Sequence, residues 1–149
     1  MPVISITIKD PKALERIKSL ADGGGKIVLP GLMDDIGKYM TEYAANEGMA
    51  SQGGVFDATW PRLSQKYAVY KAKKFPGRSI MERSGKLKDS WGYNAGETNV
   101  DLGNNTKYWV FHQGGGQHLP KRILISINDT NKKKIATFIG QALERKFSV

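Results

Sequence analysis

The sequence contains no cysteine among its 149 residues. Disulfides, thiolate metal sites and a cysteine nucleophile are therefore excluded. Long apolar runs are also missing, since no stretch approaches the roughly 20 apolar residues that a membrane-spanning helix requires. The first residues lack the basic region and apolar run of a secretory signal. We therefore expect a soluble, unexported protein that is made in a cytoplasm and has no membrane partner.

Histidine is scarce, and its placement argues against catalysis. His112 and His118 are the only two histidines, and their spacing of six residues across three glycines does not match the i, i+4 pair of a helical zinc site. No carboxylate lies within ten residues of either one on the chain. The glycine cluster before Lys26 is followed by Ile27, where a phosphate-binding loop needs serine or threonine. We therefore predict no metal, no cofactor and no enzymatic activity.

Acidic residues are too few to balance the basic ones, which leaves a formal net charge of +9. The excess is concentrated in two segments. Residues 60–90 contain nine basic and two acidic residues, and residues 120–149 contain seven and two, whereas residues 1–59 contain six and eight. Such a distribution favours contact with a polyanion or an acidic protein partner. The alternative is a solvated basic face that serves only solubility.

The first basic segment includes a predicted helix over residues 62–74. Its apolar stripe consists of Leu63, Tyr67 and Tyr70, and we interpret the two tyrosines as core residues. The neighbouring basic stripe consists of Arg62, Lys66 and Lys73, which lie close together at about 100° per residue. We predict that this basic stripe contacts either DNA, without reading its sequence, or a protein partner.

The remaining patterns predict an α+β fold in a single domain over residues 1–149, with a small antiparallel sheet packed against two or more helices. We predict a strand over residues 3–8, helices over 11–21, 30–48 and 135–146, a short helix capped by the hydroxyl of Ser84, a hairpin over 91–103, and a strand or extended segment over 123–127. Small residues without apolar periodicity predict mobile loops over 49–58 and 114–118.

Four short motifs occur in a specific order. They are Trp60-Pro61-Arg62-Leu63-Ser64, the turn Ser84-Gly85-Lys86-Leu87-Lys88-Asp89-Ser90, the segment Tyr108 to Gly115 with His112-Gln113-Gly114, and Leu119-Pro120-Lys121-Arg122 before the last helix. In this order, over roughly residues 28–147, the chain resembles the phage virion morphogenesis family of tail-completion and head-tail joining proteins.

The resemblance implies a structural virion protein at the neck or tail end. It implies a ring of identical subunits that docks to other tail or connector proteins, with possible non-specific contact to DNA in the channel. The alternative is a free nucleic-acid-binding protein whose basic helix grips phosphates without reading sequence. A hydrolase that uses His112 is a third hypothesis.

The resemblance also implies structural roles for the motif residues. Tyr108, Trp109 and Phe111 would anchor a short helix to the core, while His112 and Gln113 would satisfy backbone groups. The three glycines from Gly114 would then let the following loop turn. Trp60, Ser84, Gly85 and Arg122 would be structural residues of the other three motifs.

Overall fold

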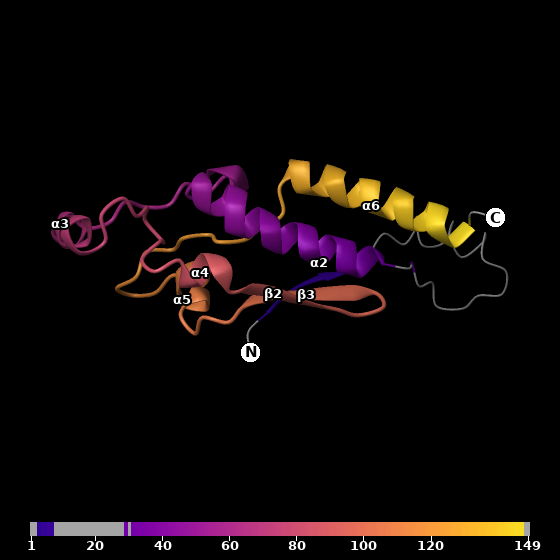
Figure 1. Ribbon diagram of the computed structural model, residues 1–149, viewed down its shortest axis with the longest axis horizontal. Coiled ribbons are helices and arrows are strands. Elements are labelled where there is room, and N and C mark those ends of the chain that lie inside the picture. The colour runs from indigo at the N-terminus through magenta and orange to yellow at the C-terminus, as the bar shows by residue number, and fades with distance from the viewer. Residues whose placement is uncertain (1–2, 8–28, 30, 148–149) are drawn as a thin grey trace.

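The computed structural model describes residues 3–7, 29 and 31–147. Its strands form one antiparallel sheet of order β1-β3-β2, and helix α2 (Leu32–Tyr43) packs against that sheet, with helix α6 (Asp129–Phe147) beyond it (Figure 1). The predicted α+β class is confirmed. The helix predicted over residues 11–21 lies outside the described residues.

The sheet joins the beginning of the chain to the predicted hairpin. Strand β1 (Ile4–Thr7) and strand β2 (Trp91–Ala95) flank the central strand β3 (Asn99–Asn104). Val100 and Leu102 of β3 are almost fully buried, because alternate side chains of a strand point to the same face. Helix α2 packs against that face of the sheet.

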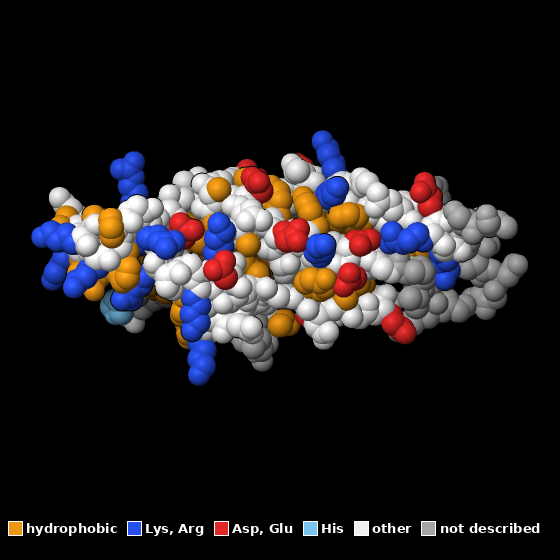
Figure 2. All heavy atoms as spheres, viewed as in Figure 1, with side chains coloured by type: hydrophobic (Ala, Val, Ile, Leu, Met, Phe, Trp, Pro, Cys, Tyr) orange, Lys and Arg blue, Asp and Glu red, His pale blue; other side chains and the backbone are white. Residues whose placement is uncertain are grey.

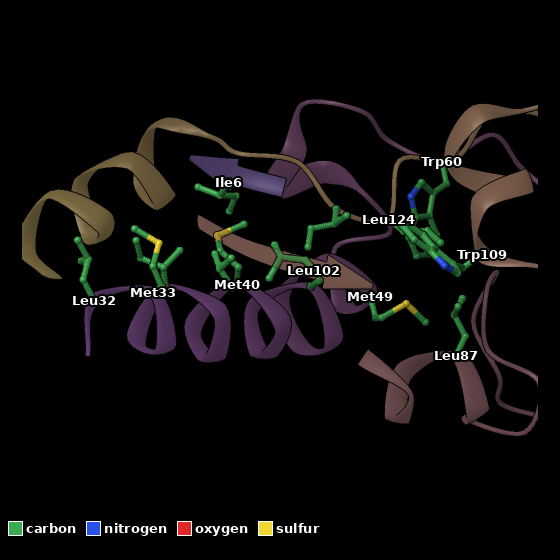
Figure 3. Packing of buried hydrophobic residues seen from close by; sticks show 14 of the residues in the cluster. Ile6, Leu32, Met33, Met40, Met49, Trp60, Leu87, Leu102, Trp109 and Leu124 are labelled. Carbon is green, nitrogen blue, oxygen red and sulfur yellow. The ribbon is translucent and has the colours of Figure 1, made fainter. Parts of the chain in front are cut away.

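Helix α2 supplies the centre of the core. Ile36 and Met40 have no exposed surface, and Figure 3 shows Met40 directed toward Leu102 of the sheet. Gly37 permits this close packing, since a Cβ atom there would lie 2.4 Å from the Tyr93 ring. The helix continues as a π-helical turn, η1 (Ala44–Gly48), so it ends where the sequence predicts, near Gly48.

Helix α6 packs against α2 through aromatic and polar contacts. The Tyr39 and Phe138 rings meet edge to face with centroids 5.7 Å apart. The helix begins at Asp129, several residues before the first apolar residue of its pattern, because Asn128 and Asn131 cap it reciprocally. The Asn131 N–H donates to Asn128 Oδ1 at 2.7 Å and the Asn128 N–H donates to Asn131 Oδ1 at 3.0 Å.

Helix α3 (Gln65–Lys74) lies at one end of the molecule, away from the sheet (Figure 1). Our interpretation of Tyr67 and Tyr70 as core residues is wrong, since they are 39% and 46% exposed. The helix does not lie along the sheet or along α2, so its apolar stripe is not covered. Lys71 is its one buried residue.

The segment predicted as a loop over residues 49–58 contains a 3-10 helix, η2 (Gly54–Phe56). Met49 and Phe56 are buried. Gly53, with a φ of 83°, lies against Trp60, and a Cβ atom there would lie 2.5 Å from its indole ring. The mobility of residues 49–58 stays a prediction.

Candidate functional site

The four motifs of the sequence meet at the α3 end of the molecule. Arg122 is buried, and its guanidinium donates from Nε and NH2 to the Pro61 carbonyl at 3.1 and 2.9 Å. Its backbone N–H donates to the His112 carbonyl at 2.7 Å. One arginine therefore ties together three segments that are far apart in the sequence.

Two further side chains hold the extended segment that precedes α6. The buried Trp60 donates from its indole Nε1 to the Ile123 carbonyl at 2.7 Å. The Gln113 amide accepts from the Leu124 and Ile125 N–H groups at 2.8 and 3.2 Å and donates to the Ile125 carbonyl at 2.8 Å. Residues 123–127 are thus an extended segment rather than a strand, because a side-chain amide takes the place of a neighbouring strand.

The serine-glycine turn differs in part from its predicted form. Helix α4 (Lys86–Asp89) is present, but Gly85, with a φ of 83°, occupies the cap position. The Ser84 hydroxyl accepts only a long 3.4 Å hydrogen bond from the Lys86 N–H. The serine hydroxyl thus accepts from a free backbone N–H of the helix, as predicted, while the N-cap residue itself is the left-handed Gly85.

The histidine segment forms the short helix α5 (Trp109–Gly114), and only part of its predicted anchoring is found. Trp109 is buried and packs against the Trp91 ring at 5.5 Å. Tyr108 and Phe111 are exposed, so their predicted role as anchors is wrong. Both side chains point away from the core because one short helix buries only one face.

Among the residues that the structure describes, the His112 ring makes no hydrogen bond to a backbone group through Nδ1, contrary to the prediction. Its Nδ1 is buried and has no hydrogen-bond partner among the described residues. Burial, with the positive charge of Arg122 as a second cause, lowers the pKa of His112 below its usual value. This shift favours the neutral form of the ring, which packs against Tyr108 with centroids 6.1 Å apart.

A cleft of about 1010 Å³ lies between α3 and this junction, and we call it the α3 cleft. Its walls are α3, residues 80–87, α5 and residues 118–122. Both histidines line it. The described residues contain no cluster of three or more histidine, aspartate or glutamate side chains that would hold a metal ion.

Lys71 is the buried residue of α3 that lines the α3 cleft. Its ammonium group donates to the Ser79 carbonyl and, at 2.8 Å, to the Ile80 carbonyl. Burial is the main cause that lowers the pKa of Lys71, and the positive charge of Arg122 acts in the same direction, while Glu82 opposes them. A buried lysine thus holds α3 against the segment that follows it.

The predicted basic stripe is only partly helical. Lys66 and Lys73 are exposed on one side of α3, seven residues apart and within about 20° of each other. Arg62 precedes the helix, which begins at Gln65, so the helical argument does not place it on the same stripe. Arg62 lines the α3 cleft, whereas Lys66 and Lys73 do not.

The loop after α5 contains the three glycines of the histidine segment. Gly114 is exposed and ends the helix, and Gly115, with a φ of 71°, turns the chain. An isolated bridge joins Gly116 to Leu119. The mobility of residues 114–118 stays a prediction.

A model of the phage virion morphogenesis family matches residues 12–144, which is most of the chain. The chain belongs to the phage virion morphogenesis family. The resemblance read from the four motifs is confirmed, and the chain has a structural role in the phage virion. No curated protein and no solved structure matches it. None of the helices in the described ranges combines the length and apolar character of a membrane span.

Three polar residues of this virion protein were missed by sequence reasoning. Asn104 is buried and donates to the Leu87 carbonyl at 2.7 Å, and its Oδ1 accepts from both the N–H and the hydroxyl of Thr106. Lys71 was missed although it follows Tyr67 by four residues on the helix. Residues four apart lie on the same face of a helix, so this spacing is the one feature of the sequence that could have placed Lys71 beside the apolar stripe.

Proposed function

We propose that this virion protein assembles as a ring of identical subunits at the neck or tail end of the particle, where it acts in tail completion or head-tail joining. The observation that carries the proposal is the exposed apolar surface of α3. Val69 and Tyr70 are 54% and 46% exposed, and Tyr67, which also lines the α3 cleft, is 39% exposed. Figure 2 shows lysine and arginine side chains gathered with hydrophobic ones over this end.

Exposed apolar side chains beside basic ones are typical of a protein interface. A ring requires two different patches that meet on neighbouring copies. The projecting α3 end is suited to be one of them, since it extends beyond the sheet and α2 (Figure 1). In the assembled particle the same end would dock to a neighbouring subunit or to another tail or connector protein.

The alternative is a free protein that binds nucleic acid without reading its sequence. Lys66 and Lys73 favour it, because two exposed lysines on one helix face can contact neighbouring phosphates. A ring whose channel admits DNA would use the same side chains.

The mass of the purified protein in solution, with electron microscopy, tests the proposal. We expect a closed ring. A monomer that binds duplex DNA and loses affinity steeply with salt would instead support the alternative.

Charge reversal then tests whether the α3 end takes part. The variant Arg62→Glu, Lys66→Glu, Lys73→Glu is compared with a control in which Lys132, Lys133 and Lys134, all exposed on α6, become glutamate. The change in charge is the same in both. We expect both monomers to remain folded and only the first to lose ring assembly. Equal assembly of the two variants would remove the α3 end from the interface.

A further inference from the structure

The α3 cleft is strongly unbalanced in charge. Five lysine or arginine side chains line it, against one carboxylate, that of Glu82. Lys71 and Arg122 are buried and bind backbone carbonyls. Their charges are therefore fixed in position, and Glu82 alone among the lining residues offsets them.

Three of the cleft cations, Arg62, Arg83 and Lys86, are exposed. The Arg83 guanidinium lies over the Phe75 ring, 4.6 Å from its centroid, which leaves Arg62 and Lys86 better placed to move toward a ligand. A flexible exposed cation reaches a carboxylate at little cost in desolvation. The buried charges deepen the positive potential, and the exposed ones supply hydrogen-bond donors.

Most of the remaining lining residues are apolar, apart from Ser64, Ser84 and the two histidines. The apolar ones include Leu63, Phe75, Ile80, Met81, Leu87 and Leu119. A nucleic acid backbone has no apolar groups that would match these side chains, and a duplex is too wide for a space of about 1010 Å³. A polypeptide supplies both carboxylates and apolar side chains.

We propose that the α3 cleft binds an extended segment of another virion protein in which glutamate or aspartate side chains accompany leucine or phenylalanine. Lys66 and Lys73 do not line the cleft. The inference does not depend on ring formation, so either proposal can fail without the other.

Binding of a short fluorescein-labelled peptide of glutamate, leucine and phenylalanine, followed by fluorescence anisotropy, tests the proposal. We expect saturable binding by the full-length protein. We expect no binding of the same peptide with lysine in place of glutamate. A duplex DNA of equal charge should not displace the peptide.

Two variants with the same loss of charge locate the site. Arg62→Ala with Lys86→Ala removes two of the three exposed cleft cations, and Lys66→Ala with Lys73→Ala removes two exposed lysines outside the cleft. We expect the first to weaken peptide binding about fivefold or more and the second less than about twofold, since each exposed pair contributes modestly. Melting curves check that both variants are folded.

Three results would overturn the proposal. One is the absence of peptide binding, and another is an equal loss in both variants, which would mean attraction by net charge alone. The third is peptide binding only after a ring has dissociated, which would assign the cleft to a second copy of the chain.

Discussion

Replacement of Gln113 by alanine tests how the extended segment is held. The amide makes three hydrogen bonds to backbone groups of Leu124 and Ile125, and these two residues are each only 2% exposed. A hydrogen bond contributes about 1 kcal/mol net, and a buried group left without a partner costs about 1–3 kcal/mol. We therefore expect the free energy of unfolding to fall by about 2–4 kcal/mol.

Urea unfolding followed by tryptophan fluorescence measures this loss. In thermal unfolding, the melting temperature of Gln113→Ala should lie roughly 5–15 °C below that of the unchanged protein. Gln117→Ala is the matched control, because Gln117 is exposed in the loop that follows. Its effect should stay below about 0.5 kcal/mol. A loss of similar size in both variants, or below about 0.5 kcal/mol for Gln113→Ala, would refute the role of the amide.

The remaining predictions concern two glycines, a histidine and two loops. Gly37→Ala should destabilise the protein by at least about 1–3 kcal/mol, because its Cβ would overlap the Tyr93 ring, whereas Gly140→Ala on α6 meets open space and should stabilise it by up to about 1 kcal/mol. Chemical denaturation compares the two. Because burial lowers the pKa of folded His112, the unfolded state takes up its proton first as the pH falls, so stability contributed by the neutral ring is complete above about pH 6.5 and declines below it. His112→Ala should lower the free energy of unfolding at pH 7 and reduce its decline with falling pH, which urea titrations at several pH values measure. Hydrolase activity that disappears in this variant at unchanged melting temperature would contradict a structural role. Amide hydrogen exchange should be fast over 49–54 and 114–118, and strong protection in both would count against their mobility.

Local patterns were sufficient for the elements that pack on the sheet. The alternation in β3 and the helical spacing of Ile36 and Met40 each identify one apolar face, and both faces are buried against each other. The stripe of Tyr67 and Tyr70 has the same kind of pattern but is exposed. Periodicity identifies which side of a helix is apolar, and it carries no information on whether another segment covers that side.

The junction of the motifs was predictable in its residues but not in its contacts. The sequence marks Arg122 and Trp60 as motif residues, yet their partners lie 61 and 63 residues away along the chain. The sequence predicted that Gln113 bonds to backbone groups. It did not predict that these groups belong to residues 123–127, because the alternation in that segment favours a strand paired with another strand. Such contacts depend on which segments the fold brings together, and no local pattern encodes that.

The partners of the hydrogen bonds distinguish residues that stabilise the fold from residues whose polar groups face solvent and can bind a ligand. Trp60, Gln113 and Arg122 use their polar atoms on backbone groups of the same chain. Loss of one of these side chains should therefore act through stability, with assembly lost only as the protein unfolds. The exposed cations Lys66 and Lys86 belong to the other group. Loss of these should leave the free energy of unfolding almost unchanged and act on binding, so stability and assembly measured on the same variants distinguish the two groups.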